Sequence, residues 1–171
     1  MCGIVGFYSS NASKYYQSIF SMISSVFHRG PNKSGVWKDF DNGIVLGHRR
    51  LSIVDLSNSG NQPMISYSGR YVIVFNGEIY NHNDLRNDLS SLDHSIHWKG
   101  HSDTETLLVA FELLGIKKTL EKIVGMFSIA LWDRNSRILS LMRDRMGEKP
   151  LYYGWQGNRG KKTFLFGSEL K

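Results

Sequence analysis

The sequence predicts an α+β domain in which helices cover antiparallel sheets. Short runs rich in Val, Ile, Phe and Tyr recur from the start of the chain to its end, with turn residues between them, which is typical of strands. Helical patterns lie between these runs, and strands followed by helices and further strands indicate helices layered on sheets. The junctions at residues 132–139 and 155–164 resemble hairpin turns, so much of the sheet should be antiparallel.

The predicted strands are short and rich in β-branched and aromatic residues, which favour a pleated, buried backbone. In chain order they cover residues 3–8, 43–54, 71–80, 126–133, 137–144, 150–155 and 163–168. The sequence contains no internal repeat, low-complexity tract or linker. We therefore expect all of these strands to belong to one domain.

Two helices are expected in the first half of the chain. Residues 13–27 place Tyr16, Ile19 and Ile23 at helical spacing behind a serine that could cap the helix. Residues 81–92 begin with several side chains that favour the N-cap position.

A third helix is expected at residues 102–115. Ser102 is its predicted N-cap, Glu105 the capping-box partner three positions on, and Gly115 its C-terminal stop. A fourth, shorter helix is expected at residues 118–124.

Composition and charge restrict the function classes. With 41% hydrophobic and 21% charged residues over 171 positions, the chain matches one globular domain. The net charge of +6 could suggest nucleic-acid binding, but the 21 basic residues are scattered among 15 acidic ones. No apolar run approaches the roughly 18 residues of a membrane span, and no signal peptide is visible. We predict a cytoplasmic protein with neither a membrane nor a nucleic-acid partner.

The single cysteine, Cys2, stands directly behind the initiator methionine. One thiol excludes an internal disulfide, which fits a reducing compartment. A structural cysteine could occupy any core position, whereas position 2 becomes the amino terminus once Met1 is removed.

A terminal cysteine can carry both a nucleophile and a base. Its thiol has a pKa of about 8.5, so only a few per cent is thiolate at pH 7. A free α-amine, with a pKa of roughly 7.7 to 8, can accept the thiol proton directly or through water. Thiolate attack on an amide then gives a tetrahedral oxyanion and, after ammonia leaves, a thioester that water hydrolyses.

Polar residues interrupt the apolar runs at three places. Asn76, Gly77 and Glu78 break one predicted strand, Arg50 lies within another, and Asp103 begins a helix. Taken singly, each fits a cap, a turn or a surface ion pair. Taken with a terminal thiol, they supply an oxyanion donor, a cation and two carboxylates that could hold a zwitterionic amino acid. This set is suited to an amide hydrolase.

Two other signals are better explained by ordinary structure. His94, His97 and His101 have spacings that could serve zinc, but no second ligand pair follows and the segment has the composition of a loop. Residues 157–162 resemble a phosphate-binding loop without its first glycine and its Ser or Thr. We predict no metal and no cofactor in this domain.

Eight segments of the sequence also match the motifs of a known family. They are "MCGIVGF", "HRGPN", "GHRRLSIVD", "NQPM", "FNGEIYN", "GHSDTE", "GMFSIALWD" and "RDRMGEKPLYYG". In this order they resemble the glutaminase domain of the asparagine synthetase type, within the class II glutamine amidotransferases, which have an N-terminal nucleophile. The resemblance covers residues 1–171 as one glutaminase domain. It implies a four-layer α/β/β/α fold with two antiparallel sheets between helical layers.

The resemblance also implies the catalytic residues. Cys2 would be the nucleophile after removal of Met1, and the Asn76 side chain and Gly77 N–H would form the oxyanion hole. The chain departs from the usual HRGPD at Asn32, which removes a carboxylate from a loop; we expect no direct catalytic consequence.

A second implied set of residues binds the amino-acid part of L-glutamine. Its arginine would bind the α-carboxylate, its acidic members would hold the α-ammonium group, and its apolar members would line the pocket through their backbone. The set is Arg50, Leu51, Ile53, Val54, Glu78 and Asp103.

The resemblance implies a further domain as partner. In the family, a C-terminal synthetase domain uses ATP and magnesium to activate a carboxylate and receives the ammonia. This chain ends at Lys171 without such a domain, so we expect it to be the N-terminal part of a longer protein. The acceptor, aspartate or a sugar carboxylate, stays open, as does assembly into a homodimer.

Two other function classes are weighed against this one. The first is a regulatory or docking module that keeps the fold without turnover, which the complete set of site residues disfavours. The second is an amidotransferase that makes amino sugars or purine precursors, which "RLSIVD", "NGEIYN" and "GHSDTE" disfavour.

Overall fold

A computed structural model describes residues 1–51, 58–158 and 162–170. Its strands are β1 (Gly3–Tyr8), β2 (Lys33–Asp39), β3 (Ile44–Arg50), β4 (Met64–Ile65), β5 (Tyr71–Ile79), β6 (Gly125–Asp133), β7 (Ile138–Arg143), β8 (Tyr152–Gln156) and β9 (Thr163–Gly167). Its helices are α1 (Ala12–Tyr15), α2 (Ser18–Ser25), α3 (His82–Leu92) and α4 (Asp103–Lys122), with 3-10 turns η1 (Phe27–Arg29) and η2 (Asn58–Gly60).

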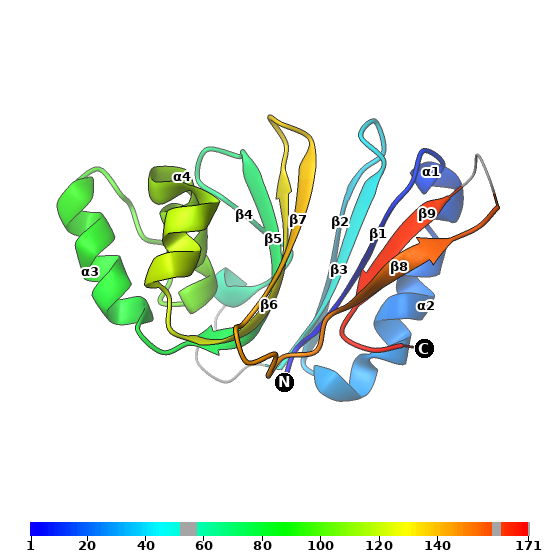
Figure 1. The fold of residues 1–171 in the computed structure, drawn as a ribbon, viewed down its shortest axis with the longest axis horizontal. Helices are drawn as coiled ribbons and strands as arrows, with labels where there is room; N and C mark the ends of the chain where they lie inside the picture. The colour runs from blue at the N-terminus through cyan, green and yellow to red at the C-terminus, as the bar shows by residue number, and fades with distance from the viewer. Residues whose placement is uncertain (52–57, 159–161, 171) are drawn as a thin grey trace.

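The strands form two antiparallel sheets. One has the order β2-β3-β1-β9-β8 and the other the order β4-β5-β6-β7. Figure 1 shows the sheets in the middle of the molecule, with α1 and α2 on one outer side and α3 and α4 on the other. The predicted four-layer α/β/β/α fold is therefore confirmed. None of the helices in the described ranges is long and apolar enough to cross a membrane.

Apolar residues fill the spaces between the layers. On β1, Ile4 points into the core between the sheets, whereas Val5 packs in the cluster that includes α2. On β5, Val74 lies between the sheets, and Phe75 packs in the cluster that includes α4. Because both faces of these central strands are buried, their sequences are continuous apolar runs without alternation. Polar residues on such strands therefore need partners.

Two strands were not predicted from the sequence. β2 is an edge strand of its sheet, and its Lys33 and Ser34 side chains are exposed. Its pairing with β3, rather than its own apolar content, makes it a strand. β4 has only two residues and pairs with β5.

The helices differ from the prediction in their details. Residues 13–27 do not form one helix, because bonds of the i to i+3 type, such as Tyr16 N–H to Ser13 O at 3.4 Å, divide the segment. The third and fourth predicted helices join into α4, which kinks at Gly115 with a φ of 77°.

One half of the predicted capping box at the start of α4 is confirmed. Ser102 Oγ accepts from Glu105 N–H at 3.2 Å, as predicted for the N-cap. The Glu105 carboxylate instead accepts from the N–H groups of Lys99 and Gly100, at 2.7 and 3.0 Å. It thereby holds the loop that precedes Asp103.

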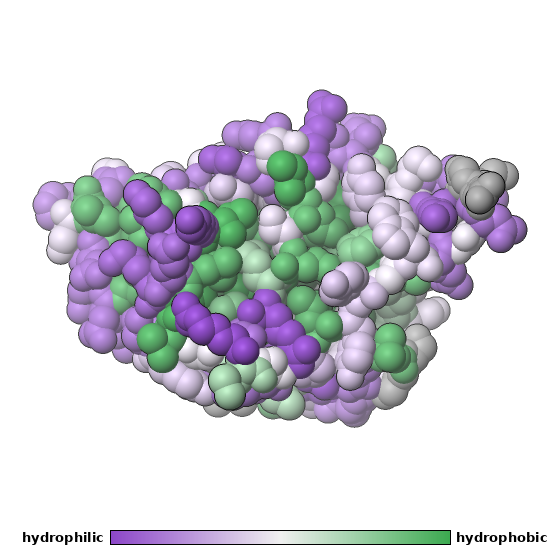
Figure 2. Space-filling view, viewed as in Figure 1, coloured by the Kyte–Doolittle hydropathy of each residue, from purple (hydrophilic) through white to green (hydrophobic). Residues whose placement is uncertain are grey.

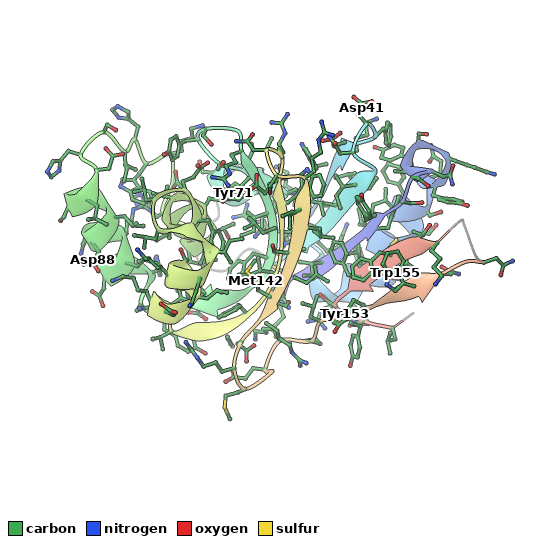
Figure 3. The ribbon with its side chains drawn as sticks, turned by 45° about the horizontal axis from the view of Figure 1, so that its top comes forward. Asp41, Tyr71, Asp88, Met142, Tyr153 and Trp155 are labelled. Carbon is green, nitrogen blue, oxygen red and sulfur yellow. The ribbon has the colours of Figure 1, made fainter. Side chains whose placement is uncertain are left out.

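Strand β8 is the least covered part of the sheets. All of its residues are exposed, and α2 packs mainly on β1 and β3. Figure 3 labels Tyr153 and Trp155 on this strand, and both rings contact Phe164 of β9. On the face shown in Figure 2, hydrophobic surface gathers near the middle, hydrophilic surface lies at the left and top, and a hydrophilic band crosses the lower middle.

Candidate active site

The start of the chain is fixed by hydrogen bonds beside β1, the central strand of its sheet. Ile4 N–H donates to Ser168 Oγ at 3.0 Å, and Ser168 N–H donates to the Ile4 carbonyl at 2.9 Å. Arg29 Nε donates to the Cys2 carbonyl at 3.1 Å, and the same guanidinium binds Glu169 at 3.1 Å. These bonds position the thiol of Cys2.

The Cys2 thiol is partly buried beside Leu51. Leu51 N–H donates to Sγ at 3.4 Å, and Sγ lies 3.8 Å from the Leu51 carbonyl oxygen. Burial raises the pKa of the thiol, and the opposing effects of the Leu51 N–H, the terminal amine and Arg50 are smaller. The resting thiol is therefore neutral, and a base is needed to make it a nucleophile.

The thiol borders a cavity of about 130 Å³. The start of β1, the end of β3, part of β5 and the N-terminus of α4 meet around it. The predicted site residues that line it are Cys2, Arg50, Leu51, Asn76, Gly77, Glu78 and Asp103. Ile53 and Val54 lie outside the described residues. The fold thus gathers residues that are up to about a hundred positions apart in the sequence.

Asn76 presents an unsatisfied donor at this cavity. Its side chain is 1% exposed, and Nδ2 has no hydrogen-bond partner in the described part of the chain. A buried amide without a partner costs about 1 to 3 kcal/mol, so a ligand that accepts from it would recover this free energy. The arrangement suits an oxygen that acquires negative charge beside the thiol.

Gly77 lies where β5 and β6 approach most closely. A Cβ built at this position would be 2.2 Å from the Met126 carbonyl oxygen and 2.8 Å from Phe127 Cα. A side chain would therefore push the two strands apart. Gly77 also lines the cavity beside Asn76.

We expect Gly77→Ala to lower the free energy of unfolding by about 1 to 3 kcal/mol, because the new methyl group overpacks the strand pair. Gly154→Ala is the matched control, since nothing lies within 4 Å of a Cβ at that position on another strand. Denaturant unfolding of both variants measures the difference. Equal stabilities would contradict the close approach of β5 and β6.

Charged groups of both signs border the cavity. Arg50 is buried, and its guanidinium donates to Asn61 Oδ1 at 2.9 Å. Asp103, the first residue of α4, accepts from Ile79 N–H at 3.1 Å. Burial raises the pKa of Asp103 despite this bond, and no ion pair joins it to a cation within the described ranges. An ammonium group bound there, with the exposed Glu78 nearby, would stabilise the carboxylate.

Gln62 and Lys149 are among the cavity residues that the sequence analysis did not single out. Gln62 is buried, with Oε1 accepting from Phe75 N–H at 2.6 Å and Nε2 donating to Thr104 Oγ1 at 3.3 Å, so it joins β5 to α4. Lys149 is also buried and lines the cavity. Both belong to segments that match family motifs, "NQPM" and "RDRMGEKPLYYG", but nothing in their local pattern indicates burial.

The residues discounted in the sequence lie apart from this cavity. His94, His97 and His101 are exposed, and the described residues contain no group of three His, Cys, Asp or Glu arranged to hold a metal ion. Asn32 donates its backbone N–H to the Arg50 carbonyl at 3.1 Å. Aspartate would make this bond equally well, so it does not depend on the departure from HRGPD.

Two facing antiparallel sheets, with a thiol at the head of a central strand, define the architecture of the N-terminal-nucleophile amidotransferases. A match to a protein-family model agrees with this class. The chain belongs to the glutamine amidotransferase domain family, whose model matches residues 1–171. The family resemblance predicted from the motifs is confirmed, and the domain is that of an enzyme.

Relatives of known name support the same assignment. The chain is 37% identical over 175 residues to asparagine synthetase [glutamine-hydrolyzing] 3 of Bacillus subtilis, covering 100% of this chain and 27% of that protein. It is 35% identical over 187 residues to putative asparagine synthetase [glutamine-hydrolyzing] 2 of Methanocaldococcus jannaschii, covering 100% of this chain and 34% of the relative. The chain thus spans about a third or less of the length of these relatives.

A solved structure shares the fold. It is the glutamine phosphoribosylpyrophosphate amidotransferase of B. subtilis, in complex with ADP and GMP. The TM-score is 0.73 at 20% sequence identity, over 98% of this chain and 42% of the other. This likeness concerns the fold alone.

Proposed function

We propose that this domain hydrolyses the side-chain amide of L-glutamine to glutamate and ammonia, with Cys2 as the nucleophile after Met1 is removed. The observation that carries the proposal is that the sole thiol meets, at one cavity, the buried amide donor of Asn76, which has no hydrogen-bond partner in the described ranges. A nucleophile and an oxyanion donor at one site are the elements that acyl transfer requires.

The reaction begins at the chain terminus. The neutral α-amine of Cys2 accepts the thiol proton, and the thiolate attacks the amide carbon of glutamine. The Asn76 side chain and the Gly77 N–H stabilise the resulting oxyanion. The ammonium group then returns its proton to the leaving nitrogen, ammonia departs and a thioester remains. Water, activated by the same amine, attacks the thioester and releases glutamate.

Charge complementarity selects the substrate. The Arg50 guanidinium offers two parallel N–H groups to the α-carboxylate of glutamine. Asp103, which lacks a cationic partner within the described ranges, binds the α-ammonium group together with Glu78. Leu51 lines the pocket beside Cys2, and Ile53 and Val54 are proposed to extend it.

The ammonia is proposed to pass to a synthetase domain in the longer protein. The relatives are asparagine synthetases whose chains are about three times this length or more. A carboxylate activated by ATP and magnesium in that part, with aspartate as the favoured acceptor, would consume the ammonia. We also infer a cytoplasmic location, because a chain with one cysteine and no internal disulfide fits a reducing compartment. A homodimer stays a prediction.

Glutamate and ammonia release from glutamine tests the proposal. Protein whose intact mass shows the loss of Met1 should form the two products in equal amounts, without ATP. A folded, Met1-free protein that forms neither product would contradict the proposed function and favour a non-catalytic module.

We expect Arg50→Lys to raise KM for glutamine by at least about tenfold, with a smaller change in kcat. A compact ammonium group cannot reproduce the two-bond grip of a guanidinium on a carboxylate. Initial rates over a range of glutamine concentrations measure both constants. An unchanged KM would place the α-carboxylate elsewhere.

A further inference from the structure

Lys149 brings a buried positive charge to the start of the chain. The residue is 5% exposed, and Nζ lies 3.0 Å from Met1 Sδ. A thioether is only a weak acceptor. No ion pair joins Lys149 to an acidic residue in the described ranges. The ammonium group is thus held near the terminus without an ion-pair partner in the described ranges, an arrangement that lowers the stability of the fold.

The backbone of Lys149 is fixed to the strand that faces Gly77. Its N–H donates to Asp144 Oδ2 at 3.0 Å, and the same oxygen accepts from Phe127 N–H at 3.1 Å. Phe127 is the direct partner of Gly77 across β5 and β6. The Lys149 carbonyl also accepts from Arg143 Nε at 2.6 Å. These backbone hydrogen bonds hold Lys149 beside the proposed oxyanion hole.

We propose that Lys149 is a positioning residue of the glutamine reaction, whose ammonium group keeps the α-amine of Cys2 uncharged and able to accept the thiol proton. The inference rests on the proposed function. A positive charge close to an amine disfavours the protonated amine, so more of the amine is the free base at neutral pH. Removal of Met1 takes away the one hydrogen-bond partner of Nζ in the described ranges and makes Cys2, which lines the same cavity as Lys149, the new terminus.

Several other charged groups surround the terminus, and the effect of Lys149 adds to theirs. Burial is the largest cause that lowers the pKa of the terminal amine of Met1; the Cys2 thiol opposes it, and Arg29 and then Lys149 lower it further. The groups that face the terminus are Arg29 of η1, with His28 and Glu169 bound to one another beside it, Arg50 of β3, Glu78 of β5, Asp103 of α4, Lys149 and the Cys2 thiol. Arg29 is bound to Glu169 and to the Cys2 carbonyl. Of the two cations Arg29 and Lys149, Lys149 is therefore the one without an ion pair to a carboxylate in the described ranges.

The test uses the pH dependence of kcat/KM in Met1-free protein. Lys149→Met keeps the length and apolar stem but removes the charge, so the acidic limb of the profile should move up by about one pH unit. The rate should fall roughly tenfold one unit below the wild-type midpoint and stay near wild type on the plateau. Lys149→Arg should keep the wild-type profile. Lys14→Met is the charge-matched control, because α1 lies at the other end of the sheets from the chain terminus (Figure 1).

A second measurement does not depend on turnover. Cys2 is the sole cysteine, so ¹³C,¹⁵N-labelled cysteine gives one set of NMR signals, and the shift of its α-nitrogen follows the amine separately from the thiol. The proposal expects the amine of Lys149→Met to titrate about one pH unit higher than that of wild type. An unchanged titration in the folded variant, with or without activity, would overturn it. Absence of turnover in wild type would contradict the proposed function, and the titration alone would then decide the role of Lys149.

Discussion

Replacing Cys2 with alanine is expected to lower glutamate formation by more than about 10⁴-fold, because no other residue in the chain can supply the thiol. Glutamine binding should persist, since we propose that Arg50 and Asp103 carry the recognition. Ammonia release gives the rate, and calorimetric titration with glutamine gives the dissociation constant.

A packing role for Cys2 predicts a different result. Loss of Sγ removes the acceptor of the Leu51 N–H, which would lower the melting temperature and leave turnover in the folded fraction. Cys2→Ser is the matched control, because its hydroxyl preserves an acceptor but is a poor nucleophile with an α-amine as base. Turnover within tenfold of wild type in folded Cys2→Ala would exclude a Cys2 thioester.

Replacing Asn76 with alanine is expected to lower kcat by roughly 10² to 10³ and to leave KM nearly unchanged. The Nδ2 donor has no partner in the described part of the chain, and its bond to the substrate oxygen strengthens as that oxygen becomes an oxyanion. Steady-state kinetics separate the two constants.

The control for Asn76 lies directly opposite on the neighbouring strand. Ser128 pairs with Asn76 in the register of β5 and β6, is equally buried, and its Oγ also lacks a partner within the described ranges. Ser128 does not line the cavity, so Ser128→Ala should keep kcat within a few fold of wild type. If Asn76→Ala and Ser128→Ala behave alike, Asn76 is a strand residue and not an oxyanion donor.

The fold was predictable where each element carries its own pattern. Strands such as β1 and β5 are buried on both faces, so nearly all of their side chains are apolar, and this continuous apolar run is visible in the sequence. Elements that depend on neighbours were not predictable. The edge strand β2 forms because its backbone pairs with that of β3. Glu105 binds the Lys99 and Gly100 N–H groups because the loop that contains them passes beside it in the folded domain.

The site was predictable for a related reason. Asn76 and Arg50 interrupt runs that would otherwise be apolar, and a polar group on a buried strand must have a partner or a ligand. Lys149 and Gln62 lie in segments where polar residues are ordinary, so only the tertiary structure shows that they are buried at the cavity. Arg29 likewise acts through a hydrogen bond to the Cys2 carbonyl, which connects residues 27 positions apart.

The state of the chain terminus tests the account most directly. Two forms of the protein, released from a cleavable fusion with either Cys2 or Met1 as the first residue, differ by one residue, and intact mass establishes which is present. An amide nitrogen at Cys2 has no basic lone pair, so the form that keeps Met1 lacks the base that the raised thiol pKa makes necessary. The account predicts ammonia release from glutamine by the Cys2-first form and a rate at least about 10³-fold lower for the Met1 form. Equal turnover by the two forms would contradict the role of the α-amine.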